Sequence, residues 1–310
     1  MSNHLPISIS NKSIVVLPFV NMSADPENEY FSDGITEEII NALAQIGNLK
    51  VTSRTSSFFF KGRNIPITEI GNELNVSTIL EGSIRLANKQ MRITAQLIDV
   101  AEDFHFWSET WDRELENMFD IQDEISLIIA DKLREHFGHL EIQEPLVEKQ
   151  TDNIAAYEYS LKAKFLRNKW NPVDVKKAVS LYKKALDLDP NHLESHLGLA
   201  DCYSFMGTTG FMPFEEAWEL TIKYTRRALE LNSLSSGVHY KLSYKAFFVE
   251  CNYAKSLEEM KKAIKLNPNY AEGQEFLSFL YIIAGDREKS LDHLGIALCL
   301  NPLSEETRFF

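Results

Sequence analysis

The sequence predicts two parts, an α/β domain with a mixed sheet in the first half of the chain and an all-α solenoid in the second half. In the first half, short apolar runs of the β type alternate with segments whose apolar residues recur every three or four positions. In the second half, one sequence frame occurs four times, at intervals of 43, 35 and 34 residues. A chain of 310 residues, 44% of them hydrophobic, is long enough to bury two ordinary cores.

The first half is a succession of expected strands and helices. We expect residues 1–12 to be disordered, residues 13–140 to form the α/β domain and residues 141–152 to be a linker. The expected strands cover residues 13–20, 49–53, 76–100 (a hairpin that turns at 87–89) and 104–115, and the expected helices cover residues 35–46, 67–75 and 121–137. Strands and helices alternate first and a run of strands follows, which indicates a mixed sheet.

Residues 25–40, DPENEYFSDGITEEII, hold six carboxylates. Asp33 precedes the periodic helix and is expected to be its N-cap, and Glu37 and Glu38 would then lie in its first turn, at the positive end of the helix dipole. Gly34 is expected to supply turn geometry. No His or Cys lies nearby and the spacing does not fit a calcium loop. Since no glycine-rich phosphate-binding motif occurs either, the sequence predicts no metal and no cofactor.

The four repeated segments of the second half are AVSLYKKALDLDP (178–190), TIKYTRRALELNS (221–233), SLEEMKKAIKLNP (256–268) and SLDHLGIALCLNP (290–302). Their frame resembles the tetratricopeptide repeat, a helix hairpin of about 34 residues. Small residues let the two helices approach, and proline stops the second helix. We expect about four repeats over residues 153–310, with an insertion in the 43-residue interval. The opening of a truncated helix after Pro302 favours a fragment of a longer protein.

Repeats of this kind stack into a curved rod whose concave wall is lined by the first helix of each hairpin. The resemblance implies ten candidate partner-binding residues on this wall: Glu194, Leu197, Asp201, Phe205, Lys241, Lys245, Phe248, Glu275, Phe279 and Ile282. Phe248, Phe279 and Ile282 could equally pack between neighbouring hairpins. Lys241 and Lys245 lie four apart on one helical face and could bind a carboxylate, although a solvated basic face has the same pattern.

Five stretches of the first half carry a second resemblance: SIVVLPFVNMSADPENEYFSDGITEEIINAL (13–43), RTSSFFFKG (54–62), LEGSIR (80–85), RITAQLIDVAEDFHFWSETWDREL (92–115) and DIQDEIS (120–126). They resemble the TolB-like amino-terminal module of bacterial regulatory proteins. Such modules commonly precede tetratricopeptide repeats and are joined to a DNA-binding domain, as in AraC-type and CadC-like transcriptional regulators, or to an adenylate cyclase domain. The resemblance implies that this chain is the sensor half of such a protein, with the effector domain not among these residues.

Negative charge is concentrated in the first half, where residues 1–150 carry −12 of the net charge of −13. An acidic surface repels nucleic-acid phosphates, so we expect no direct nucleic-acid binding by this chain. No apolar run approaches the ~20 residues of a membrane helix, so no membrane span is expected. The chain as given begins without a secretion signal and is expected to be cytoplasmic. The alternative is the periplasm, if the chain belongs to a single-pass membrane regulator.

The sequence therefore predicts a non-enzymatic regulatory module that binds a protein or peptide partner, as part of a signal-responsive transcription regulator. The alternative is a subunit associated with an adenylate cyclase that senses a nucleotide or sugar near residues 21–33, because open α/β sheets bind ligands at strand ends. Phe59 is a candidate docking residue, since three consecutive phenylalanines cannot share one face. A homodimer is left open.

Overall fold

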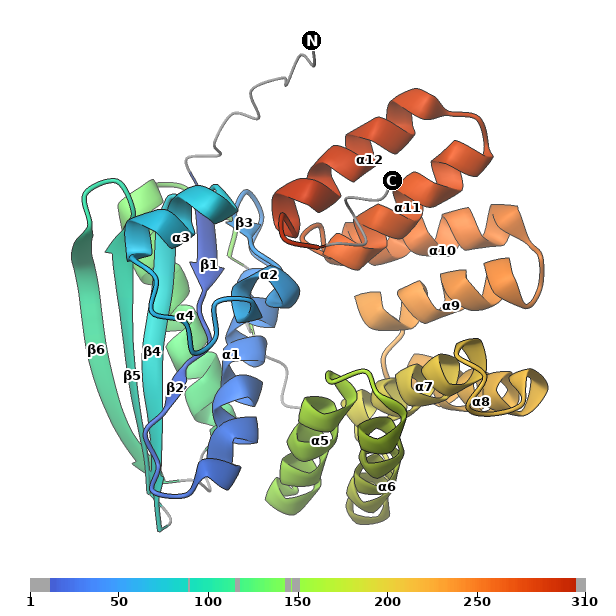
Figure 1. Ribbon diagram of the computed structural model, residues 1–310, viewed down its shortest axis with the longest axis horizontal. Coiled ribbons are helices and arrows are strands. Elements are labelled where there is room, and N and C mark those ends of the chain that lie inside the picture. Colours follow the sequence, from blue (N-terminus) through green and yellow to red (C-terminus); the bar gives the residue numbers. More distant parts are fainter. Residues whose placement is uncertain (1–11, 89, 115–117, 143–145, 147–150, 305–310) are drawn as a thin grey trace.

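The structure is a computed structural model that describes residues 12–88, 90–114, 118–142, 146 and 151–304 (Figure 1). A mixed sheet with helices forms the first half, and a curved array of helix hairpins forms the second half. This confirms the two-part fold that the sequence predicts. Residues 1–11 of the predicted disordered segment 1–12, most of the predicted linker 141–152 and most of the truncated helix expected after Pro302 lie outside the described residues.

The sheet has the strand order β3-β1-β4-β5-β6, and β2 also pairs with β4. Its strands are β1 (Ser13–Val16), β2 (Val20–Asn21), β3 (Lys50–Val51), β4 (Thr78–Ala87), β5 (Gln90–Asp99) and β6 (Phe104–Glu114). β1 runs parallel to both β3 and β4, whereas β4, β5 and β6 are antiparallel neighbours. The predicted hairpin over residues 76–100 is therefore present, with Asn88 in the left-handed conformation at its turn.

Helices cover both faces of this sheet. They are α1 (Glu29–Leu43), α2 (Arg54–Phe58), α3 (Ile67–Leu74) and α4 (Met118–Phe137). Alternate residues of β1 point to opposite faces: Ile14 belongs to a core with α1 and α4, whereas Val15 belongs to a smaller core with α3. No helix was predicted over the residues of α2.

The acidic stretch does not cap a helix as predicted. Asp25 caps a short 3₁₀ helix, η1 (Pro26–Asn28), by accepting a hydrogen bond from the Glu27 amide at 2.9 Å, and α1 follows directly from Glu29. The residues expected at the start of the helix thus lie inside α1, where they are buried: Asp33, Gly34, Glu37 and Glu38. The predicted N-cap at Asp33, the first-turn position of the two glutamates and the turn at Gly34 are wrong.

The described part of the second half forms four helix hairpins. Their helices are α5 (Ile154–Arg167), α6 (Pro172–Leu188), α7 (Leu193–Thr208), α8 (Phe214–Leu231), α9 (Ser236–Phe248), α10 (Tyr253–Leu266), α11 (Ala271–Ile283) and α12 (Arg287–Leu300). The recurring alanines of the sequence frame are all buried: Ala185, Ala228, Ala263 and Ala297. The 43-residue interval contains a longer loop after α7 and 18 residues in α8, against 14 in α10, as the predicted insertion requires.

Neighbouring hairpins pack through a close approach at Gly198 on α7. A Cβ atom at this position would lie 2.2 Å from Cζ of Tyr182 on α6. Tyr182 is 1% exposed and packs with Leu199 and Cys202 of α7. Only glycine leaves room for this ring, so the stacking of the first two hairpins depends on this pair of residues.

The curved array contacts the α/β domain at two places, which we call joint one and joint two (Figure 1). At joint one, α5 lies against α1, and Tyr157 and Leu161 of α5 belong to the core that also holds Ile14 and Ile35. Gly34 of α1 makes room for Leu161, because a Cβ there would lie 2.7 Å from its Cδ2. At joint two, Asn269 and the residues that follow α12 contact β3 and α2. The two parts are therefore docked rather than linked only through the chain.

His192 is the N-cap of α7, and its Nδ1 accepts a hydrogen bond from the Ser195 amide at 3.1 Å. The ring is fully buried, and this burial lowers the pKa of His192 more than Glu194 and Asp189 raise it. An unfolded chain takes up the proton near the ordinary His pKa of about 6.5, before the folded chain does. We therefore expect the free energy of unfolding to fall as the pH drops below about 6.5.

Urea unfolding at pH 7.5 and pH 5.5 measures this effect. His192→Asn keeps a side-chain acceptor at the N-cap and does not titrate, so the loss of stability between the two pH values should be smaller in this variant. Burial also lowers the pKa of His196 and His293, so part of the pH dependence should remain. Equal losses in the variant and the natural chain would contradict the role of His192.

None of the helices in the described ranges is both long enough and apolar enough to cross a membrane.

Candidate functional site on the concave face

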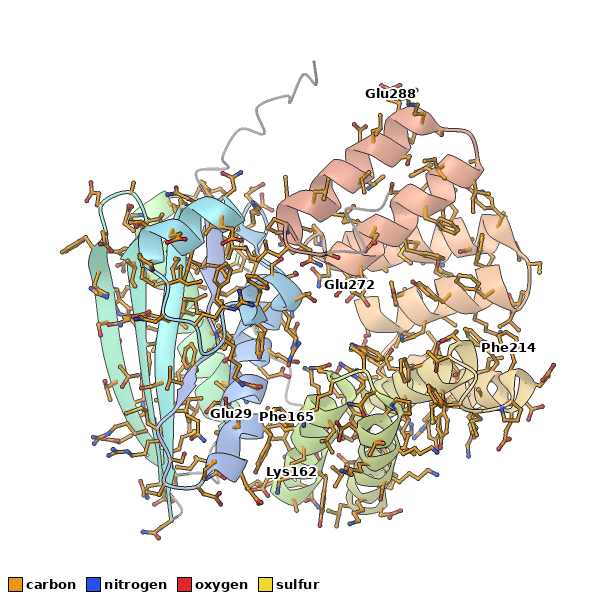
Figure 2. All side chains as sticks on the ribbon, in the orientation of Figure 1. Glu29, Lys162, Phe165, Phe214, Glu272 and Glu288 are labelled. Atoms are coloured by element: carbon orange, nitrogen blue, oxygen red, sulfur yellow. The ribbon has the colours of Figure 1, made fainter. Side chains whose placement is uncertain are left out.

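The first helices of the hairpins, α5, α7, α9 and α11, line the inner side of the curve, which faces α1 and α2 (Figure 1). Side chains of α5, among them Lys162 and Phe165, project toward α1 (Figure 2). Lys162 places its Nζ 4.8 Å from the centre of the Tyr30 ring of α1. The concave side is thus occupied near α5 by the chain's own α/β domain.

The contact between α1 and α5 contains a buried group of charges. Lys164 Nζ lies 3.1 Å from Oε2 of Glu37 and 3.4 Å from Oε1 of Glu38. Glu37 also accepts hydrogen bonds from Arg54 of α2 and, at 3.0 Å, from Nδ2 of Asn168. Since Glu37 and Glu38 are both less than a tenth exposed, they are held in the interface by these cations rather than by water.

The pKa values of Glu37 and Glu38 shift in opposite directions in this environment. Burial by itself would raise the pKa of Glu37, but Lys164, Arg54 and Arg167 together hold that pKa below its usual range. Burial raises the pKa of Glu38, and the negative charges of Glu194 and Glu37 add to this increase, against the opposing effect of Lys164. Lys164 has a raised pKa despite its burial, because Glu37, Glu38 and Glu194 surround it. Glu37 and Lys164 are therefore a charged pair at neutral pH.

Asp33 extends this group of charges toward α2. It accepts a hydrogen bond from Lys61, which also lies 2.7 Å from Oε1 of Glu29. Burial raises the pKa of Asp33, while the hydrogen bond and charge of Lys61 act in the opposite direction. The acidic face of α1 thus meets cations from both the segment after β3 and α5.

A second charged group continues along the concave face from α5 to α9. Arg167 Nη1 donates to Oδ2 of Asp201 at 2.8 Å, and Lys241 pairs with the other carboxylate oxygen. Burial would raise the pKa of Asp201, but Lys241 and Arg167 lower it below its usual range. Asp201 therefore bridges the first and third hairpins with a negative charge held between two cations.

Beyond these charges, the concave face becomes aromatic. Six rings of α9 and α11 contact one another, and we call them the aromatic strip: Tyr240, Tyr244, Phe247, Phe248, Phe276 and Phe279. The Tyr244 and Phe276 ring centres are 4.2 Å apart, and those of Phe247 and Phe279 are 5.5 Å apart. Phe248 is 48% exposed, and Ile282, one turn after Phe279, is 55% exposed. A strip of packed rings with an exposed end can bind apolar side chains.

The structure distributes the ten predicted groove residues over four environments. Leu197 is buried between hairpins with Ala228 and Val238. Asp201 and Lys241 belong to the ion pairs just described, and Glu194 influences the pKa of Glu38. Phe248 and Phe279 are rings of the aromatic strip, and Ile282 lies exposed one turn after Phe279. The remaining residues are partly buried: Phe205 lies 5.4 Å from the Trp170 ring, Lys245 pairs with Glu250 at 2.6 Å, and Glu275 lies on α11.

Lys241 and Lys245 point to different acids, Asp201 and Glu250 respectively. Phe59, the candidate docking residue, is 41% exposed at the end of α2, and the Arg63 guanidinium lies 3.6 Å from its ring centre. Its neighbour Phe60 is buried in the core with α3.

Lys164, Arg167 and Arg54 were not predicted as parts of this site. One signal was present in the sequence. Leu161 follows Tyr157 by four residues and Lys164 follows Leu161 by three, so Lys164 continues their buried helical stripe. The partner helix α1 could not be read from this spacing. Across the described ranges, no three His, Cys, Asp or Glu side chains are grouped as metal ligands. The charges and rings of this face are suited to contact and positioning, because its carboxylates are already paired with cations.

Comparison with known proteins gives limited likenesses. No family model matches the chain. It is 38% identical over 188 residues to "Putative adenylate cyclase 3" of Rhizobium meliloti (strain 1021), which is 61% of this chain and 32% of that protein. The chain thus spans about a third of the length of the curated relative that it matches.

Solved structures with partial likeness include two that are named as TPR proteins. The crystal structure of MamA is 24% identical with a TM-score of 0.34, and covers 45% of this chain and 74% of its own. TTC0263, a thermophilic TPR protein of Thermus thermophilus, is 15% identical with a TM-score of 0.40, and covers 61% and 88%. YrrB, a TPR protein, is 19% identical with a TM-score of 0.28, and covers 50% and 90%. The repeat architecture of this chain rests on its own hairpins and recurring alanines.

Proposed function

We propose that this chain is a non-catalytic regulatory module that binds an apolar segment of a protein partner along the aromatic strip. The observation that carries the proposal is exposed apolar surface at and near the strip: Phe248, a ring of the strip, is 48% exposed, and Ile282, one turn after Phe279 on α11, is 55% exposed. Stacked helix hairpins present such surfaces on a rigid frame, which is how repeat proteins bind extended partners.

A peptide-display library panned on the immobilised full chain tests this proposal. We expect enrichment of peptides with aromatic or large aliphatic residues, bound about 5- to 30-fold more weakly by the Phe248→Ser and Phe279→Ser variants, because each anchor ring contributes of order 1–2 kcal/mol. Phe104→Ser is the matched control, since Phe104 is 56% exposed but lies on β6 of the α/β domain.

The control variant should bind the selected peptides as the natural chain does. If the selected peptides bind the strip variants unchanged but no longer bind the Phe104→Ser variant, the binding site lies on the α/β domain and the proposal is refuted. Failure to enrich any peptide would also refute the proposal.

The effector that such a module would control is a separate proposal. The resemblance of the first half to TolB-like modules suggests either a DNA-binding or an adenylate cyclase effector, and the partial relative carries the name of a putative cyclase. We therefore favour a cyclase-linked role over transcription regulation. Replacing the matching segment of that relative by this chain should preserve the formation of cyclic AMP and its regulation, whereas loss of regulation with activity retained would argue against the cyclase-linked role.

The alternative of a nucleotide or sugar sensor concerns residues 21–33. Here Asn21 donates to the Asp25 carbonyl at 3.3 Å and accepts from the Ser23 amide at 2.9 Å. Asp33 is covered by Lys61. Polar groups that are engaged with one another are less available to a ligand. A thermal-shift screen with nucleotides and sugars separates the two ideas: a rise of several degrees with one compound would favour the sensor.

A further inference from the structure

Joint two covers the outer edge of the sheet with side chains and loop backbone. The inner edge of β3 pairs with β1, since the Thr52 amide donates to the Ile14 carbonyl at 2.9 Å. The outer edge of the same segment is met by Asn269, in the loop between α10 and α11, and by Leu300 at the end of α12. The two edges of one short strand are therefore satisfied by different parts of the chain.

Asn269 replaces a neighbouring strand at this edge. Its Oδ1 accepts from the Val51 amide at 3.1 Å, and its Nδ2 donates to the Leu49 carbonyl at 3.0 Å. A residue of a parallel strand would make the same pair of hydrogen bonds. Nδ2 also donates to the Ala44 carbonyl at 2.9 Å, so this one amide is bonded to the end of α1 as well.

The rest of joint two is likewise made of hydrogen bonds. The Ser53 amide donates to the Leu300 carbonyl at 2.7 Å. Ser56 Oγ donates to Oδ1 of Asn301 at 2.7 Å and accepts from the Leu303 amide at 3.0 Å. Leu303 adds an apolar contact, because it packs against the small core of the α3 face.

The two joints differ in the kind of interaction that holds them. Joint one buries Tyr157 and Leu161 in the main core and holds Lys164 between two glutamates. Joint two consists mainly of hydrogen bonds that water can replace, each of which shifts an equilibrium by roughly two- to tenfold. A contact of this kind opens at a lower free energy than a shared core.

We infer that joint two is a latch: it opens while α5 stays on α1. Opening frees the Leu49 carbonyl and the Val51 and Ser53 amides, an edge that can pair with an extended backbone, and releases the last hairpin from the α/β domain. Under the proposed function, this movement changes the curvature of the surface that holds the aromatic strip. The latch itself does not depend on the proposed function.

Residue-resolved amide hydrogen exchange on the full chain tests the latch without any partner. The reporters are the Ser53 amide on the outer edge and the Thr52 amide on the inner edge of the same strand segment. In the natural chain, Ser53 should exchange at least about tenfold faster than Thr52, after correction for intrinsic rates. In Asn269→Ala and in Ser56→Ala, Ser53 should exchange about tenfold faster still, with Thr52 unchanged. Neither substitution touches the Ser53 hydrogen bond directly.

Asn191→Ala is the matched control. Asn191 occupies the same position in the first repeat, where its amide bonds to Asp189 as the Asn269 amide bonds to Asn267, but its side chain accepts from Arg227 within the solenoid. This variant should leave both reporters unchanged. Equal protection of Ser53 and Thr52 in the natural chain would overturn the latch, even if a variant failed to fold. An unchanged Ser53 rate in both joint-two variants would also overturn it.

Discussion

Replacing Lys164 by Met should lower the free energy of unfolding by about 3–5 kcal/mol, because the change removes the buried charge that offsets the Glu37 and Glu38 carboxylates together. Lys164 has a 14% exposed side chain and lies within 3.4 Å of both Glu37 and Glu38. Methionine fills a similar volume but carries no charge, so packing is nearly preserved and the loss reports the electrostatics. The urea midpoint measured by circular dichroism gives the magnitude.

Lys176→Met is the control for this experiment, since Lys176 is an exposed residue of α6 and its replacement should change stability by less than about 0.5 kcal/mol. Adding Glu38→Gln to Lys164→Met should restore part of the lost free energy of unfolding, because the neutral amide carries no buried charge for a cation to offset. A loss in Lys164→Met as small as that of the control would show that water, rather than Lys164, compensates the two glutamates.

Gly198→Ala should destabilise the chain by about 2 kcal/mol, although alanine is the better helix former by about 1 kcal/mol. The added Cβ would lie 2.2 Å from the buried Tyr182 ring, which must move or push α6 away from α7. The opposite result is expected at Gly295 of α12, where a Cβ meets nothing within 4 Å. Gly295→Ala should therefore stabilise the chain by up to about 1 kcal/mol.

Thermal unfolding of the two alanine variants side by side checks this contrast. A stabilised Gly198→Ala variant would mean that the first two hairpins can separate without cost, and it would contradict the close packing of α6 on α7. Adding Tyr182→Leu to Gly198→Ala should relieve the clash, and the double variant should be less impaired than the two separate losses imply.

Much of the fold could be predicted from periodicity. The hairpin over residues 76–100 alternates with a period of two, and the hairpin frame recurs around Ala185, Ala228 and their equivalents, so each local pattern agrees with the structure. The start of α1 was missed because Asp33 has the chemistry of an N-cap and the apolar periodicity was counted from Ile35. Phe31, four residues before Ile35 and buried with it, was the signal that the helix begins earlier.

The candidate site was less predictable, because its charges belong to elements far apart in the chain. Asp201 and Lys241 are 40 residues apart, and Glu37 and Lys164 are 127 apart. Helical spacing shows that Lys164 lies in a buried stripe, but no local rule indicates which helix covers that stripe. Two of the six rings of the aromatic strip, Phe248 and Phe279, were among the residues that the repeat resemblance selected.

The shared core at joint one has a consequence for how such proteins are divided and recombined. Tyr157 and Leu161 complete the packing around Ile14 and Ile35. Separating the chain between residues 140 and 153 would therefore expose apolar surface on both pieces. The smallest unit that can be transferred to another protein without exposing this core therefore includes the first hairpin together with the sheet. Exchange of repeats between proteins of this architecture is then constrained at both ends of the array, at the first hairpin by joint one and at the last hairpin by joint two.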